Sequence, residues 1–172
     1  TGEYLLADSY LSVIEAIKYS AYTQNKKPVL TWLNAFDFEK NPQKVKELGS
    51  FDGVLIPGGF GSRGIEGKLN VIKYVRENKI PYFGICYGMQ LAIVEYARNV
   101  LGLKGAHTTE VDPKTPYNII DIMESQKKNI LNSRYCGNMR LGGYIEVMNK
   151  GTLAEKLYKK NSIVERHRHR YE

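Results

Sequence analysis

The sequence predicts an α/β fold, in which a doubly wound and mainly parallel sheet carries helices on both faces. Two apolar stretches, 51–56 and 80–86, have the length of buried strands. A helical repeat of apolar residues follows each of them, at 65–75 and at 89–100. Strands that alternate with helices form parallel sheets through right-handed crossovers. Binding sites in such sheets lie beyond the carboxyl ends of the strands.

The remaining elements are predicted from local patterns. Asp8 or Ser9 can cap a helix whose apolar side recurs from Tyr10 to Ala21. The apolar run Val29–Leu33 is typical of a buried strand. Further on, we expect a short helix from Pro42 to Leu48, irregular chain up to the apolar stretch 119–123, a strand over 139–147, a short helix capped by Thr152, and an extended stretch from Ile163. The lysine-rich stretch Glu124–Tyr135 is expected to be a mobile connection.

Composition favours one globular domain over residues 1–172. Hydrophobic residues make up 42% of the chain and charged residues 25%. No apolar run approaches the roughly 20 residues that span a bilayer, and no signal-peptide pattern occurs at the start. Two cysteines fit a reducing cytoplasm. The net charge of +7 comes from scattered side chains, with one basic cluster at 166–170, so we expect neither a nucleic-acid partner nor a membrane.

The stretch Gly84–Gly88 has the form of a nucleophile elbow with sulfur in place of oxygen. Cys86 stands where a strand turns directly into a helix, with glycines two residues to either side. A residue on such a turn is strained, and flanking side chains would collide. The helix N-terminus is expected to favour the thiolate of Cys86 over the thiol. The alternative is a structural cysteine at an ordinary strand–helix junction.

A second glycine-rich stretch, Pro57–Gly64, also follows a predicted strand. Its four glycines allow the backbone to approach a ligand and to present N–H groups to it. The spacing matches neither a P-loop nor GxGxxG, and a plain tight turn is equally compatible with it. Because both strands end at the same edge of the sheet, we expect this stretch and Cys86 to share a site.

A cysteine nucleophile needs an oxyanion hole and a base. The backbone N–H of Tyr87 is the natural first oxyanion donor, and one near Gly59 is the second. The base is harder to assign. The chain has three histidines, His107, His167 and His169, and the last two alternate along an expected strand so that both face one way. An isolated histidine is more often a hydrogen-bonded or surface residue than a base.

The motif Gly84–Gln90 resembles the nucleophile motif of class-I (triad) glutamine amidotransferases. Further stretches make the likeness more specific, to the amidotransferase domain of the CTP synthase family, over nearly the whole chain. They are Tyr10–Ala16, Pro57–Gly61, Arg63–Lys68, Ala106–Glu110, Met139–Gly142 and His167–Glu172. The resemblance implies the flavodoxin-like fold of that class.

The resemblance also implies a reaction, in which Cys86 attacks the side-chain amide of glutamine, ammonia leaves, and water releases glutamate. The implied oxyanion donors are Gly59 and Tyr87. The implied glutamine contacts are Gly59, Tyr87, Gly88, Met89, Gln90, Glu110 and Arg170. Glu110 and Arg170 are an anion and a cation, which suits the zwitterionic end of a free amino acid.

In the family, ammonia passes to a synthase domain that aminates UTP to CTP and uses ATP and magnesium there. GTP activates the glutaminase step, and Arg63, Gly64 and Glu66 match the loop linked to that effect. The resemblance therefore implies glutamine as substrate, a synthase domain as partner, GTP as activator, a homotetramer, and no cofactor or metal in this domain.

The chain departs from the family pattern at three places. Tyr87 stands where leucine is usual, and Tyr135–Asn138 differs from the usual residues before Met139. The family's catalytic His and Glu lie in a His-Pro-Glu stretch beyond the motif that closes this chain at Glu172. We therefore expect residues 1–172 to lack the C-terminal segment and the synthase domain, and to turn over slowly or not at all.

Two alternatives remain open at this point. One is the amidotransferase of another synthase, such as the imidazole glycerol phosphate enzyme, which shares the elbow motif. The other is a non-catalytic nucleotide-sensing module of the same fold, in which Cys86 is structural.

Overall fold

The computed structural model describes residues 7–124, 126–127 and 139–172 of the chain. The chain divides into two compact units, one ending at Ile120 and the other beginning at Asp121. Most of the expected connection Glu124–Tyr135, and Cys136 after it, lie outside the described residues. The first unit holds Cys86 and both glycine-rich stretches.

The first unit has the α/β character that the sequence predicts. Strand β1 pairs in parallel with β2, Val54 opposite Tyr82, and β3 pairs in parallel with β4. Its elements are the 3-10 helices η1 (Ala7–Tyr10) and η2 (Pro42–Ser50), the helices α1 (Leu11–Thr23), α2 (Ala35–Lys40), α3 (Ile65–Glu77) and α4 (Tyr87–Asn99), and the strands β1 (Val54–Ile56), β2 (Tyr82–Gly84), β3 (His107–Thr108) and β4 (Asn118–Ile120). The order β1-α3-β2-α4 confirms the alternation of strands and helices.

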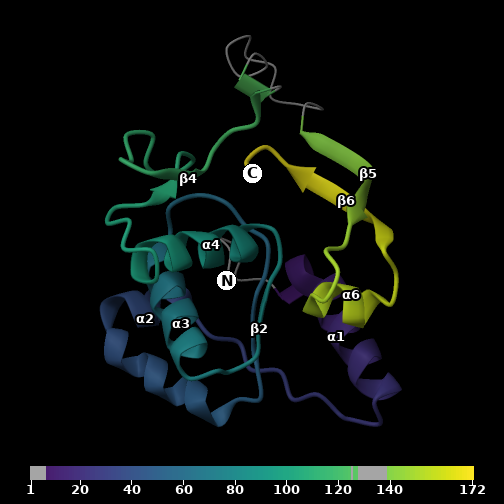
Figure 1. Cartoon of the computed structure of the whole chain (residues 1–172). Coiled ribbons are helices and arrows are strands. Elements are labelled where there is room, and N and C mark those ends of the chain that lie inside the picture. The colour runs from purple at the N-terminus through teal and green to yellow at the C-terminus, as the bar shows by residue number, and fades with distance from the viewer. Residues whose placement is uncertain (1–6, 125, 128–138) are drawn as a thin grey trace. The chain divides into compact units, whose positions relative to one another are not determined.

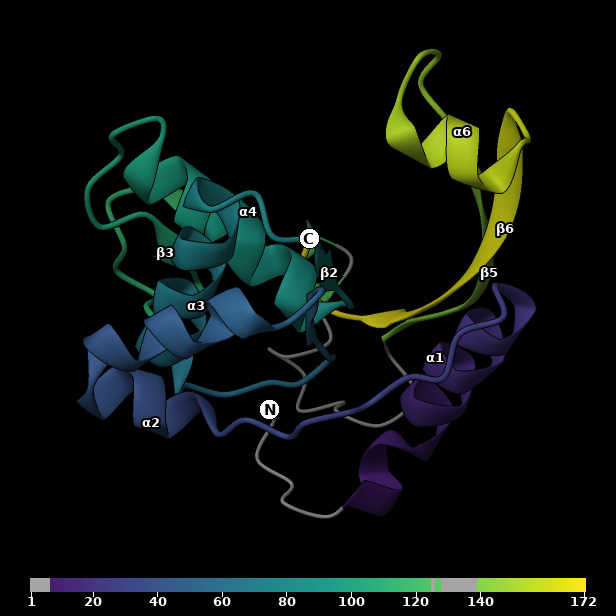
Figure 2. The same ribbon diagram turned by 90° about the horizontal axis from the view of Figure 1, so that it is seen from below.

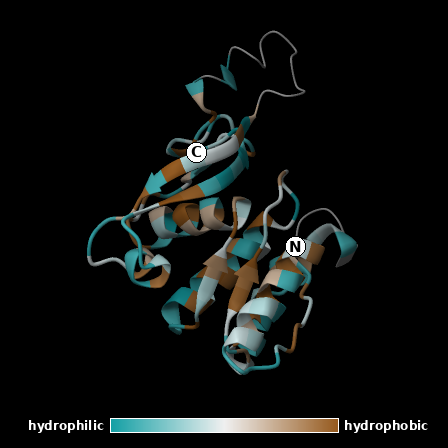
Figure 3. Cartoon of the chain, turned by 90° about the vertical axis from the view of Figure 1, so that its right-hand side faces the viewer, coloured by the Kyte–Doolittle hydropathy of each residue, from teal (hydrophilic) through white to brown (hydrophobic). Residues whose placement is uncertain are grey.

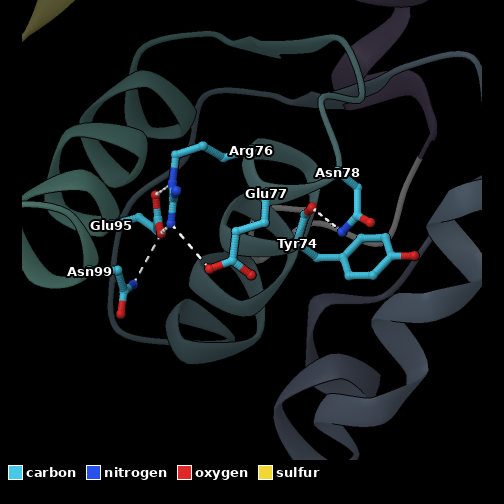
Figure 4. Close-up of polar contacts among 6 residues, drawn as sticks. All are labelled: Tyr74, Arg76, Glu77, Asn78, Glu95 and Asn99. Atoms are coloured by element: carbon cyan, nitrogen blue, oxygen red, sulfur yellow. Dashed lines mark hydrogen bonds and ion pairs between the residues drawn. The ribbon is translucent and has the colours of Figure 1, made fainter.

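Helix α3 lies between α2 and α4 and forms the centre of the core (Figures 1 and 2). The helices carry hydrophobic and hydrophilic residues side by side in Figure 3, as amphipathic helices do. Val75 of α3 and Leu91 of α4 are fully buried. At Gly67 a Cβ would stand 1.9 Å from the carbonyl oxygen of Ala35, so glycine permits the close approach of α2. Arg76 of α3 pairs with the buried Glu95 of α4 (Figure 4).

Two local predictions are wrong. Neither Asp8 nor Ser9 caps α1, because the 3-10 helix η1 precedes it and Tyr10 occupies the N-cap without a side-chain hydrogen bond. Val29–Leu33 is not a strand, and Val29 is 88% exposed. A strand needs a neighbour for its backbone hydrogen bonds. This segment instead lines an apolar cavity of about 420 Å³ with residues of α1, β1 and β2.

The second unit is built on an antiparallel pair of strands, β5 (Arg140–Val147) and β6 (Ser162–His169). Helix α6 (Leu153–Tyr158) lies in the connection between them (Figure 2). The predicted cap is confirmed, since Thr152 Oγ1 accepts the N–H of Glu155 at 3.3 Å. His167 and His169 share the half-buried face of β6, also as predicted. None of the helices in the described residues has the length and apolar character needed to cross a bilayer.

Candidate active site

Cys86 occupies the sharp turn that the sequence predicts between β2 and α4. It is the N-cap residue of α4, with φ 51° and ψ −105°, a backbone conformation that residues other than glycine rarely adopt. A Cβ on Gly84 would stand 2.6 Å from the backbone of Gly88 and Met89. A Cβ on Gly88 would stand 2.1 Å from the carbonyl oxygen of Ile56. The two glycines are therefore required by close backbone contacts on both sides of the cysteine.

The glycine-rich loop after β1 lies directly beside this turn. A Cβ built on Gly58 would be 3.5 Å from the Cβ of Cys86. Gly61 has φ 78°, and its N–H donates to Oε1 of Glu110 at 3.2 Å. Its carbonyl accepts the hydroxyl of Tyr87 at 2.6 Å. The structure thus brings the loop, the elbow and Glu110 into one place, although they come from three separate parts of the chain.

The environment of Cys86 favours the thiol. Solvent reaches the side chain, yet protein atoms occupy much of the space around it, and this burial raises the pKa of the Cys86 thiol above its ordinary value. A hydrogen bond from the backbone N–H of Tyr87 lowers that pKa, and the carboxylate of Glu110 raises it. The N–H of Tyr87, at the N-terminus of α4, thus acts in the predicted direction, but burial outweighs it and the net shift of the Cys86 pKa is upward. Deprotonation of Cys86 therefore calls for a base.

The predicted substrate contacts of the first unit come from the loop after β1, from α4 and from the turn after β3. Gly59 is half-buried in the loop after β1. On α4, Gly88 is buried, Met89 is 51% exposed, and Gln90 is buried with its N–H donating to the carbonyl of Cys86. Glu110 is half-buried in the turn that follows β3.

The last predicted contact, Arg170, lies in the second unit. It follows β6, is half-buried, and accepts the N–H of Met123 on its carbonyl at 2.9 Å. On the same unit a hydrogen-bonded chain runs from Glu146 through His167 to His169. Its contacts are 2.9 Å from Glu146 Oε1 to His167 Nε2 and 2.8 Å between the two imidazoles.

His107 is the single histidine of residues 1–120, and it has a structural role. It is 8% exposed, and its Nδ1 accepts the N–H of Thr108 at 2.9 Å. Burial, and then the nearby Arg98 guanidinium, lower the pKa of His107. The ring is therefore neutral and engaged within β3, which does not suit a base for Cys86.

The residues predicted to form an effector loop precede and begin α3. The Arg63 guanidinium lies 4.8 Å from the ring centroid of Phe36. Gly64 has φ 68°, which glycine adopts without strain. Glu66 forms an ion pair with Arg98 at 2.9 Å. In the part of the chain that the structure describes, no three His, Cys, Asp or Glu residues are placed to hold a metal ion.

Sequence reasoning missed two buried polar side chains at this site. It used only the backbone of Tyr87, whereas the side chain is 1% exposed and bonded to Gly61. It assigned no role to Lys68, which is 3% exposed with its Nζ 5.2 Å from the centroid of the Tyr87 ring. The one sequence signal for a role of the Tyr87 side chain was the departure already noted, tyrosine in place of the leucine that is usual in the family that the chain resembles.

Comparison with known proteins agrees with this geometry. Residues 5–172 match the family model described as glutamine amidotransferase class-I. CTP synthase of Pyrococcus abyssi is 51% identical over 172 residues, covering 99% of this chain and 31% of that protein. CTP synthase of Staphylococcus epidermidis is 52% identical over 173 residues, with coverages of 99% and 31%. The chain spans about a third of the length of these curated relatives.

A solved structure is also similar, that of the Trypanosoma brucei CTPS glutaminase domain with bound acivicin. It superposes with a TM-score of 0.89 at 33% sequence identity, covering 99% of this chain and 65% of the other. This likeness supports the α/β architecture, whose parallel strand pairs lie in the first unit.

Proposed function

Because the chain belongs to the class-I glutamine amidotransferase family, we propose that it hydrolyses glutamine with Cys86 as the nucleophile. The observation that carries this proposal is the strained position of Cys86 at the N-terminus of α4, beside the glycine-rich loop after β1. Backbone N–H groups at Tyr87 and near Gly59 are then available to a developing oxyanion. Each such donor contributes roughly 3–4 kcal/mol to transition-state stabilisation.

The reaction proceeds in two steps. The thiolate of Cys86 attacks the amide carbon of the glutamine side chain, and a tetrahedral oxyanion forms. The C–N bond breaks, the nitrogen takes up a proton, and ammonia departs. A glutamyl thioester on Cys86 remains. Water then attacks the thioester, glutamate departs, and the sulfur regains a proton. Glu110 binds the α-amino group of the substrate, and Gly88, Met89 and Gln90 border the bound substrate.

The base that deprotonates Cys86 lies outside residues 1–120 in this proposal. Those residues contain one histidine, His107, and its Nδ1 is engaged by Thr108. The base serves both steps, because it takes the proton of Cys86 in the first and the proton of the attacking water in the second. Loss of a triad base lowers turnover by several orders of magnitude.

The proposed consumer of the ammonia is a synthase domain of the CTP synthase type. Its reaction is the ATP- and magnesium-dependent amination of UTP to CTP, in a cytoplasmic homotetramer. The curated relatives with this name and 51–52% identity support that choice over another synthase. GTP is the proposed activator, with the Arg63 cation available to a phosphate at the start of α3.

Labelling with a glutamine-analogue electrophile, followed by peptide mass spectrometry on the full-length protein, tests the nucleophile. We expect stoichiometric modification of Cys86, none in Cys86→Ser, and undiminished labelling in Cys136→Ser. The site is also expected to bind acivicin, the compound named with the Trypanosoma brucei structure. A protein that leaves Cys86 unmodified would be a sensing module rather than an amidotransferase.

A further inference from the structure

The side chain of Tyr87 points away from solvent and toward the glycine-rich loop. It belongs to the first residue of α4, directly after Cys86, and is 1% exposed. Its hydroxyl donates to the carbonyl oxygen of Gly61 at 2.6 Å. This bond joins the elbow to a loop that precedes it by 26 residues.

Gly61 is held through both of its polar backbone groups. Its carbonyl accepts from Tyr87, and its N–H donates to Glu110 Oε1 at 3.2 Å. Its φ of 78° lies in the left-handed region, which favours glycine. These two hydrogen bonds limit the conformational freedom of Gly61, and Gly58 and Gly59 lie just before it in the same loop.

The surroundings of Tyr87 keep its hydroxyl a donor. Burial, and then the carboxylate of Glu110, raise the pKa of Tyr87 above its ordinary value, so the phenol stays protonated at working pH. The Nζ of the buried Lys68 lies 5.2 Å from the ring centroid, a cation–π contact that fixes the ring. Removing the hydroxyl alone is therefore expected to remove the hydrogen bond to Gly61 and to leave the ring in its place.

We propose that the Tyr87 hydroxyl is a positioning group that holds the glycine-rich loop in register with Cys86, so that the loop's N–H donors meet the oxyanion. This inference rests on the proposed glutaminase function. The Tyr87 hydroxyl acts through the loop, because no step of the reaction moves a proton to or from it or forms a bond with it. An oxyanion donor acts in the transition state, and a displacement of about 1 Å can cost on the order of 100-fold in rate.

The test compares Tyr87→Phe with Tyr82→Phe in the full-length protein. Tyr82 makes a matched bond from the other side of the elbow, with its hydroxyl donating to the carbonyl of Gly88 at 2.7 Å. Each variant keeps its ring and loses one hydrogen bond, so we expect the two variants to lose similar amounts of stability. Only Tyr87→Phe releases Gly61. The measurements are ammonia release from glutamine and amide hydrogen exchange of peptides covering residues 57–64.

For Tyr87→Phe we expect kcat to fall about 10- to 100-fold, while KM changes by less than about twofold. Exchange in 57–64 accelerates in Tyr87→Phe and stays at the wild-type rate in Tyr82→Phe. Equal exchange of 57–64 in the wild type and Tyr87→Phe overturns the inference, as does an equal loss of kcat in both variants. A wild-type protein that releases no ammonia overturns the proposed function, whereas the exchange comparison still decides whether Tyr87 holds the loop.

Discussion

Arg76 holds Glu95 with two hydrogen bonds, from Nε to Oε2 at 2.9 Å and from a terminal nitrogen to Oε1 at 2.8 Å (Figure 4). The glutamate is 1% exposed, and Asn99 donates to the same Oε1 at 3.1 Å. This pair joins α3 to α4, the helix that begins at the cysteine elbow. Glu95 lies about two helical turns after the start of α4, so the ion pair helps to fix the position of the helix that carries the elbow.

Replacing Glu95 with alanine is expected to destabilise the protein by about 2–3 kcal/mol. The variant leaves the Arg76 charge without its buried partner, and partial exposure of the arginine moderates the loss. Glu77→Ala is the matched control, because Glu77 lies 3.6 Å from the same guanidinium but is half-exposed. Its cost should be below about 1 kcal/mol. Equal unfolding free energies of the two variants in urea titrations would contradict the role assigned to Glu95.

Alanine at Gly88 is expected to cost about 3 kcal/mol or more and to abolish labelling of Cys86. The new Cβ would stand 2.1 Å from the carbonyl oxygen of Ile56, and neither backbone can move without displacing the elbow. Gly49→Ala is the control, because the nearest atom to its Cβ is the Tyr74 hydroxyl, at the far end of a side chain and 3.3 Å away. Thermal unfolding of both variants checks the difference, and a Gly88→Ala protein as stable as Gly49→Ala would refute it.

Alkylation of Cys86 should become fast only at a higher pH than alkylation of an unstructured cysteine. Burial raises its pKa, and the Glu110 carboxylate contributes in the same direction. Removing that charge in Glu110→Gln lowers the pKa, so the pH profile of iodoacetamide labelling moves toward lower pH. A Cys136→Ser background restricts the signal to Cys86, and Glu77→Gln serves as a remote charge control. A profile that moves upward, or stays in place, contradicts the electrostatic account.

Stability is expected to decline as the pH falls below about 6.5, with His107 as one contributor. Burial lowers the pKa of His107 in the folded state, so the unfolded chain binds more protons between that lowered pKa and 6.5. His107→Gln removes this titration. The difference in unfolding temperature between wild type and variant should therefore narrow from pH 7.5 to pH 5. A constant difference would mean that His107 does not titrate in this range.

Much of the first unit follows from local pattern. The apolar runs before Gly58 and Cys86 predict β1 and β2, and the helical repeats after them predict α3 and α4. Each pattern is complete within a dozen residues, so it needs no distant partner to be recognised. The same reasoning wrongly predicted a strand over Val29–Leu33, because a strand also needs a neighbouring strand, and the local sequence does not reveal whether one is present.

By itself, the sequence determined the cysteine elbow, because a strained turn flanked by glycines leaves a short and specific signature around Cys86. It also predicted the glycine-rich loop as the companion of this elbow, because the loop follows a strand of the same sheet. Only the tertiary structure decided what surrounds the cysteine. Gly61 meets Tyr87 across 26 residues and Glu110 across 49, and such contacts arise when separate elements pack. The same packing raises the pKa of Cys86, since burial is a property of the folded chain.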